Sequence, residues 1–187
     1  GISIVFNGEI YNFREIKKEL EGAGYSFRTT SDTEVVCAAY LEYGEDCVNR
    51  FNGMFAFVIY DPESNILFGA RDRLGQKPLY YSLDGGEFEF ASQLDAVAEG
   101  NGFSVSDRSV TDYLLWGYIP EPGSIYSEIG KVRAGHSFTY HLGEREFREK
   151  KYWDLDYRRE NVYTGGYAAA ADRLEELLKD AVSRRMI

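Results

Sequence analysis

The chain reads MFAFVIY from Met54 to Tyr60, and this unbroken apolar run decides the fold class. An apolar run without alternation is typical of a strand that is covered on both faces. Turn-forming residues fill positions 61–65, and Ile66–Ala70 follows as the expected partner strand of a hairpin. The starting point of the fold is therefore a buried strand in an antiparallel sheet.

Two helices are predicted before this strand. Asn12 is followed by Glu15, and Ser31 by Glu34, at the spacing of a capping box. Apolar side chains recur at helical spacing after each cap. Ile2–Phe6 precedes both helices as a short buried strand. The helices expected in the whole chain span 12–22, 32–43, 107–116 and 168–185.

The segment after the hairpin continues with strand signals. A turn at 84–86 separates strand-like segments at 79–82 and 87–91, which indicates a second hairpin. Short strands and turns are expected over 124–154, and Val162–Gly166 is interpreted as a linker. Helices combined with paired strands predict the α+β class and largely antiparallel pairing.

Length and composition narrow the class of protein further. The 187 residues fit one domain with the edge of a second, and 44% apolar residues suffice for a packed core. No run of about 18 apolar residues is present that would span a membrane. The net charge of −10 argues against nucleic acid, whose binding depends on Lys and Arg. No secretory signal is recognisable, and the abrupt apolar start after Gly1 predicts a missing N-terminal segment.

The two cysteines and two histidines give little chemistry of their own. Cys37 and Cys47 form neither a disulfide framework nor a zinc motif, so a reduced cytoplasmic compartment is expected. Cys37 lies on a helix face predicted to be buried, and Cys47 has no basic partner nearby in sequence. His136 and His141 are too isolated for a metal site or a catalytic triad.

Asn7 and Asp32 belong to two candidate sites. Asn7-Gly8 is a strong hairpin signal, but a helix rather than a strand follows it. The alternative is an oxyanion hole, in which the Asn7 side chain and the Gly8 N–H donate to one oxygen. Asp32 lies in the first turn of a helix, where the dipole favours a carboxylate. Asp32 either serves only to stabilise the start of this helix, or it also faces a pocket and holds the ammonium group of a ligand.

A third candidate is the connection Arg71–Tyr81. The favoured interpretation is a tight structural link between strands rather than direct contact with a substrate. Gly75 is expected to adopt an unusual backbone angle, Pro78 to stiffen the exit, and Arg71 to pair with Asp72.

These motifs occur together in a recognisable order. Along the chain they are Phe6–Asn12 (FNGEIYN), Ser31–Glu34 (SDTE), Gly53–Phe57 (GMFAF), Ala70–Tyr81 (ARDRLGQKPLYY) and Phe90–Ser92 (FAS). The ordered set resembles the glutaminase domain of asparagine synthetase, a class II glutamine amidotransferase with an N-terminal nucleophile. The resemblance covers residues 3–157, and the last helix resembles the start of a synthetase domain.

The resemblance implies a fold and a division into domains. The fold is a four-layer α-β-β-α sandwich of two antiparallel sheets, the Ntn-hydrolase type. Residues 1–157 would be a glutamine amidotransferase domain that lacks its N-terminal part. Residues 158–187 would be a linker and the first helix of a synthetase (ATP-pyrophosphatase) domain.

The resemblance also implies a mechanism. A cysteine at the mature N-terminus attacks the side-chain amide of glutamine, with its own α-amino group as base. The ammonia passes to the synthetase domain, where ATP activates aspartate. No cofactor or metal is expected in residues 1–187, and ATP and Mg²⁺ belong to the synthetase domain.

Carried onto this chain, the resemblance makes Asn7 and Gly8 the oxyanion hole and thus the catalytic residues. Together with Glu9 and Asp32 they are expected to bind the substrate, with Asp32 on its α-ammonium group. The family's cysteine and the arginine that binds the substrate carboxylate fall before Gly1. Residues 1–187 alone are therefore expected not to hydrolyse glutamine.

Two other functions remain open. A related amidotransferase would pass ammonia to another acceptor, such as a sugar or a cell-wall precursor. A non-catalytic domain would bind glutamine or dock a partner. The expected partners are glutamine, the synthetase domain of the same polypeptide and a second copy in a homodimer, without nucleic acid or membrane.

Overall fold

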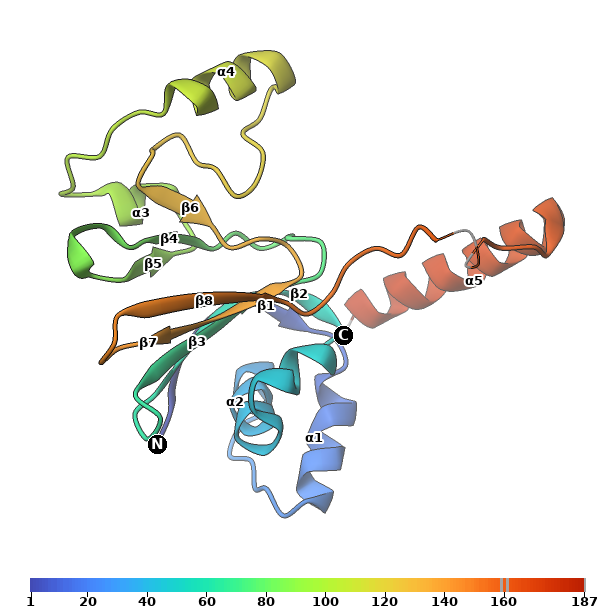
Figure 1. Cartoon of the computed structure of the whole chain (residues 1–187). Helices are drawn as coiled ribbons and strands as arrows, with labels where there is room; N and C mark the ends of the chain where they lie inside the picture. Colours follow the sequence, from blue (N-terminus) through green and yellow to red (C-terminus); the bar gives the residue numbers. More distant parts are fainter. Residues whose placement is uncertain (159, 161, 187) are drawn as a thin grey trace.

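The computed structural model describes residues 1–158, 160 and 162–186. Its strands form two antiparallel sheets, one of five strands in the order β1-β2-β3-β7-β8 and one of three in the order β5-β4-β6. Helices α1 and α2 cover one face of the larger sheet, and α3 and α4 lie beyond the smaller sheet (Figure 1). The predicted α+β class and the α-β-β-α layer order implied by the resemblance are confirmed.

The strands are β1 (Ser3–Ile10), β2 (Gly53–Asp61), β3 (Ile66–Arg71), β4 (Tyr80–Ser82), β5 (Glu89–Ala91), β6 (Ile129–Lys131), β7 (His136–His141) and β8 (Glu146–Lys151). The α-helices are α1 (Phe13–Gly22), α2 (Asp32–Tyr43), α3 (Leu94–Ala98), α4 (Asp107–Trp116) and α5 (Gly166–Arg185). Two short 3-10 helices are η1 (Gly44–Asn49) and η2 (Asp84–Gly86). No helix in the described ranges has the length and hydropathy to cross a membrane.

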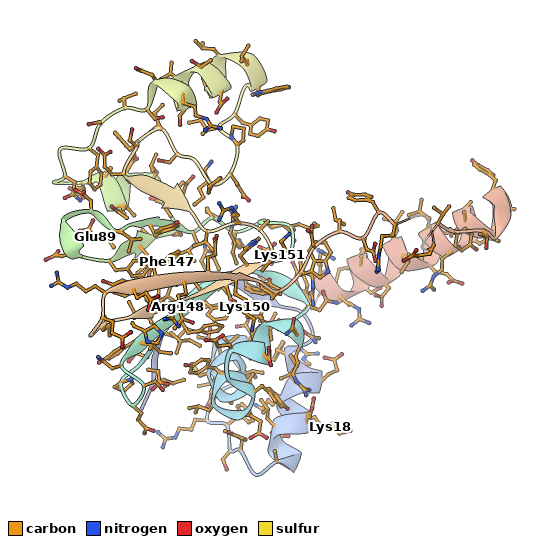
Figure 2. All side chains as sticks on the ribbon, in the orientation of Figure 1. Lys18, Glu89, Phe147, Arg148, Lys150 and Lys151 are labelled. Carbon is orange, nitrogen blue, oxygen red and sulfur yellow. The ribbon has the colours of Figure 1, made fainter. Side chains whose placement is uncertain are left out.

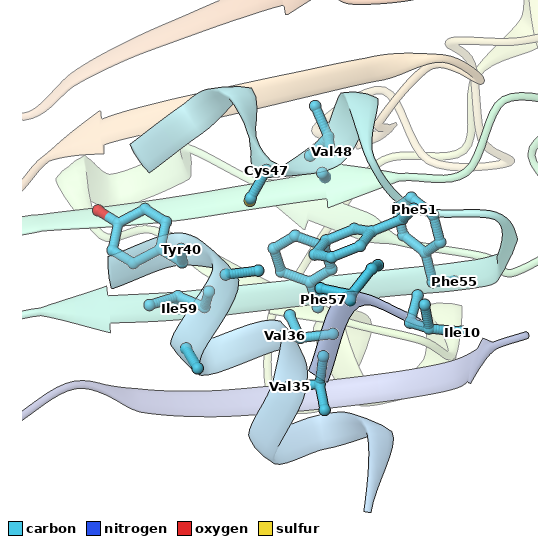
Figure 3. Close-up of a cluster of buried hydrophobic side chains, with 14 of the residues drawn as sticks. Ile10, Val35, Val36, Tyr40, Cys47, Val48, Phe51, Phe55, Phe57 and Ile59 are labelled. Carbon is cyan, nitrogen blue, oxygen red and sulfur yellow. The ribbon is translucent and has the colours of Figure 1, made fainter. Parts of the chain in front are cut away.

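Strand β2 supplies the core on both of its faces, as its unbroken apolar run predicted. Phe55, Phe57 and Ile59 are fully buried and pack with α1, α2 and η1. Figure 3 shows these side chains gathered around Val36 of α2. Ala56 alternates with them and packs toward the second sheet. The hydrophobic effect therefore places β2 between two apolar layers.

Aromatic rings fill the space between the two sheets. Phe147 of β8 lies there (Figure 2), with its ring centroid 4.7 Å from that of Tyr81 on β4. The ring centroid of Phe138 on β7 is 5.2 Å from that of Phe147. Stacked pairs of this kind add to the free energy gained from apolar burial, so they fix the smaller sheet against the larger one.

Several element boundaries differ from the prediction. Strand β1 extends to Ile10, four residues beyond the predicted end, because it pairs along its whole length with β2. Helix α3 was not predicted. Helix α5 begins at Gly166, inside the predicted linker Val162–Gly166. Arg159, Asn161 and Ile187, which fall in the segment 158–187 predicted as a linker and first helix, lie outside the described residues.

The predicted capping boxes do not form as expected. The Asn12 side chain makes no cap bond to α1; its Nδ2 donates to Arg50 O (2.9 Å), and its Oδ1 accepts from Asn52 N (2.8 Å). Ser31 does cap α2, accepting from Thr33 N at 3.2 Å. The reciprocal bond from Glu34 is replaced by bonds to residues 28 and 29. Nearby loops therefore compete with the helix ends for these side chains.

Candidate functional site

Asn7 lies in the middle of β1, opposite Ala56 of β2. Alternation along the strand directs its side chain toward the second sheet, since Ile4, Phe6 and Ile10 pack on the helix side. There it lines a cavity of about 140 Å³ together with the apolar side chains of Val58, Leu79 and Phe90. The Asn7 amide has no hydrogen-bond partner in the described part of the chain. It is a free polar group at a cavity whose other lining residues, apart from Ser92, are apolar.

Gly8 occupies a position that only glycine fits. Its φ is +153°, and a Cβ added there would lie 2.2 Å from Met54 O and 2.6 Å from Phe55 Cα. Any side chain would therefore push β1 away from β2 at this point. Glycine at position 8 is therefore what lets β1 pair closely with β2 at this point.

The direction of the Gly8 N–H follows from its partner across the ladder. Phe55 is the residue opposite Gly8, and both of its backbone polar groups are bonded on the β3 side. Phe55 N donates to Asp72 Oδ2 at 3.2 Å, and Phe55 O accepts from Asp72 N at 2.8 Å. Gly8 and Phe55 thus form a non-hydrogen-bonded pair, in which each residue directs its N–H away from the other. The Gly8 N–H accordingly points to the outer edge of β1, which is an edge strand of its sheet.

Asp32 lies at this same edge. Its Oδ2 accepts from Ile10 N at 3.0 Å, so the Ile10 N–H also points outward, as alternation requires of residues 8 and 10. Two residues of extended strand span roughly 6.6 Å. The Asp32 carboxylate is therefore about one glutamine length along the edge from the Gly8 N–H. Its Oδ1 has no hydrogen-bond partner in the ranges that the structure describes.

The four predicted site residues are only partly brought together. Asn7, Gly8 and Glu9 are consecutive on β1, and Asp32 joins the same edge from α2. The Glu9 side chain is exposed and makes no hydrogen bond or ion pair with any described residue. The cavity at Asn7 is not lined by Gly8, Glu9 or Asp32. A larger hollow of about 530 Å³ lies beside α4 and contains none of the four.

The connection after β3 is held by two buried side chains. Asp72, with 0% of its surface exposed, accepts four backbone N–H groups, from Phe55 and from positions 74, 76 and 77. Arg71 donates to the carbonyls of residues 75, 77 and 132 and pairs with Glu121. The predicted Arg71–Asp72 pair is therefore wrong, because each side chain satisfies the backbone instead. The predicted unusual angle of Gly75 is confirmed by its φ of +65°.

Neither cysteine has the environment of a nucleophile. Cys47 is buried, and desolvation raises the pKa of its thiol to about 12. Cys37 is half-buried, and desolvation followed by the charge of Glu34 raises the pKa of its thiol. Because the reactive form is the thiolate, both residues favour the unreactive protonated state.

Comparison with known sequences gives a consistent family. Residues 1–153 match the glutamine amidotransferase domain family. Asparagine synthetase [glutamine-hydrolyzing] 3 of Bacillus subtilis (strain 168) is 34% identical over 188 residues, which cover 99% of this chain and 30% of that protein. Asparagine synthetase [glutamine-hydrolyzing] 1 of the same organism is 40% identical over 137 residues, covering 73% and 22%. The chain thus spans less than a third of the length of either relative.

A solved structure shares the fold. The glutamine phosphoribosylpyrophosphate amidotransferase of B. subtilis superposes with a TM-score of 0.58 at 19% sequence identity. The match covers 81% of this chain and 29% of that one. At this identity the likeness concerns the arrangement of sheets and helices.

Proposed function

The chain belongs to the glutamine amidotransferase domain family, and from this we propose that it is the glutamine-hydrolysing part of an asparagine synthetase. It would release ammonia from the side-chain amide of glutamine for ATP-dependent amidation of aspartate by a synthetase domain of the same polypeptide. That domain would use ATP and Mg²⁺, and we assign no residue of this chain to bind either of them. The relatives' names and the match over residues 1–153 support the proposal.

One observation carries the assignment of the site: Gly8 and Asp32 share the open edge of β1. The Gly8 N–H points away from β2 at this edge, and the Asp32 carboxylate accepts from Ile10 N, two residues further along β1. A glutamine laid along this edge would place its side-chain carbonyl near Gly8 and its α-ammonium near Asp32. We assign the neighbouring amide of Asn7 as the second donor to the oxyanion, and Glu9 to the same pocket.

The nucleophile is proposed to be neither of the two cysteines of this chain. A thiol whose pKa is raised by burial is protonated at neutral pH and attacks poorly. The family mechanism, in which an N-terminal cysteine is activated by its own α-amino group, would supply the nucleophile from outside residues 1–187. The free thiols of Cys37 and Cys47 support a reducing, cytoplasmic compartment.

The assignment predicts different kinetic effects at the two ends of the substrate. In the full gene product, Asn7→Ala should lower kcat for glutamine hydrolysis by roughly 100- to 1000-fold, because it removes a donor to the charge that develops on the carbonyl oxygen. Asp32→Asn should instead raise KM for glutamine roughly tenfold or more, because a charge-assisted bond to the ammonium is lost. The asparagine oxygen still accepts from Ile10 N–H, so the strand edge is preserved. Ammonia release from glutamine is the measurement.

Asn101→Ala is the matched control, because it removes a side-chain amide at a position outside the candidate site. The Asn101 amide donates to the side chain of Glu89 and to Val97 O. Its kcat and KM should equal those of the unsubstituted protein. Full turnover in Asn7→Ala, or an unchanged KM in Asp32→Asn, would contradict the assigned roles. An amidotransferase with a different acceptor would hydrolyse glutamine equally but form no asparagine from aspartate and ATP.

A further inference from the structure

The Asp72 side chain makes four hydrogen bonds near the candidate site, yet it does not line the cavity at Asn7. Its carboxylate is fully buried, and each oxygen accepts two backbone N–H groups. Three of the four donors belong to the loop that follows it. Such a carboxylate replaces the hydration that it has lost with bonds to the chain.

The fourth donor connects Asp72 to β2. Phe55 N donates to its carboxylate, and Phe55 O accepts from its backbone N–H. Both polar groups of Phe55 are thereby held on the side of β3. If the backbone N–H and C=O of Phe55 pointed toward β1 instead, they would form hydrogen bonds with the C=O and N–H of Gly8, which lies directly opposite. The Gly8 N–H would then no longer be free for a substrate. The two strands are already close at Gly8, because a Cβ added there would lie 2.2 Å from Met54 O and 2.6 Å from Phe55 Cα.

We propose that Asp72 is a positioning residue that keeps the Gly8 N–H free and aimed at the open edge of β1 by holding Phe55 on the opposite side. The catalytic effect of Asp72 rests on the proposed function. The direction of the Gly8 N–H can be tested by hydrogen exchange, without a measurement of glutamine hydrolysis. Asp72 acts across β2 and does not contact the substrate.

The test is Asp72→Asn in the full gene product. Whichever way the amide is oriented, its nitrogen cannot accept, so two of the four N–H bonds are lost and a donor faces donors. We expect kcat for glutamine hydrolysis to fall roughly 10- to 100-fold, as small displacements of catalytic groups do, while KM for glutamine changes by less than about threefold. Hydrogen exchange should accelerate in segments 7–10 and 53–56 more than in segments 3–5 and 58–61.

Asp61→Asn is the matched control. Asp61 is an aspartate at the other end of the same β2–β3 hairpin and also accepts backbone N–H groups, from Glu63 at 3.0 Å and Ser64 at 3.3 Å. It is six residues along β2 from Phe55. Its replacement should loosen segment 58–61 and leave kcat unchanged. Equal loss of kcat in both variants, or unchanged exchange at 53–56 in Asp72→Asn, would overturn the proposal.

A third measurement covers the case in which Asp72→Asn does not fold. In the unsubstituted protein, the N–H of Gly8 should exchange much faster than those of Asn7 and Glu9, which alternation directs toward β2. Equal protection of the three would refute the geometry. If the full protein does not hydrolyse glutamine at all, the proposed function fails, whereas the exchange patterns still test the direction of the Gly8 N–H and, in the Asp72→Asn and Asp61→Asn variants, the role of Asp72.

Discussion

At the scale of single residues, the site depends on what is missing at Gly8 as much as on what is present at Asn7. The edge of β1 can accept a ligand because the N–H of Gly8 is not consumed by the ladder, and β1 can pair with β2 there because position 8 has no side chain. Substitution here therefore tests packing and function together, whereas Asn7 tests function alone.

Gly8→Ala should destabilise the protein on the order of 3 kcal/mol, because the new Cβ would meet Met54 O at 2.2 Å and the backbone angle disfavours a side chain. Glutaminase activity should fall with it. Urea unfolding measures the change in the free energy of unfolding. The control is Gly102→Ala, since a Cβ at Gly102 meets nothing within 4 Å. That variant should be neutral or more stable by about 0.4 to 1 kcal/mol, and a loss equal to that of Gly8→Ala would contradict the packing argument.

At the scale of elements, the junction between β1 and α1 is tied to the entry of β2 rather than capped on its own helix. Asn12 bridges Arg50 O and Asn52 N, and the neighbouring Tyr11 N donates to Asn52 O at 2.8 Å. These bonds close the end of the β1–β2 pair, just beyond the edge that carries Gly8 and Ile10.

Replacement of Asn12 distinguishes the bridge from a helix cap. Asn12→Ala should cost about 1 to 2 kcal/mol of stability, because two hydrogen bonds between segments are lost. Asn12→Ser should cost nearly as much, although serine is a good N-cap, because its side chain cannot span both backbone groups. Chemical denaturation of the two variants gives the comparison. Full stability of Asn12→Ser together with loss in Asn12→Ala would favour capping instead.

At the scale of the whole molecule, burial of the core couples stability to pH. Cys47 belongs to η1 and is part of the core that contains Phe57 of β2 (Figure 3), and burial raises the pKa of its thiol from 9.0 to about 12. A group whose pKa is higher in the folded state stabilises fully below its unfolded pKa. That contribution is lost as the pH rises from about 9 toward 12, because only the unfolded chain releases the proton.

The free energy of unfolding should therefore fall between pH 9 and 11 with a contribution from Cys47 of up to about 1.4 kcal/mol per pH unit. Denaturation curves at several pH values measure this slope. Tyrosine and lysine residues titrate in the same range, so the Cys47→Ala variant is the reference. It should be less stable at pH 7 because of the cavity, but its stability should decline less steeply with pH. Parallel declines would show that the thiol does not contribute.

The sequence by itself determined the elements, because their signals are local. The apolar run at β2, the turn residues at 61–65 and the Ser31 cap act on neighbouring positions, and β2, β3, α2 and α4 lie where these patterns predicted. Helix α3 was missed because its single buried residue, Val97, gives too little periodicity. The family resemblance also singled out Asn7, Gly8 and Asp32 from their types and order.

Only the tertiary structure decided which groups these residues face. Pairing with β2 extends β1 through Asn7 and Gly8, and its register directs the N–H groups of Gly8 and Ile10 to the open edge, where Asp32 meets them. Arg71 binds Glu121, fifty positions away, rather than its neighbour Asp72. Hydrogen-bond partners are fixed by proximity in space, and a local pattern cannot encode proximity that arises when distant strands align.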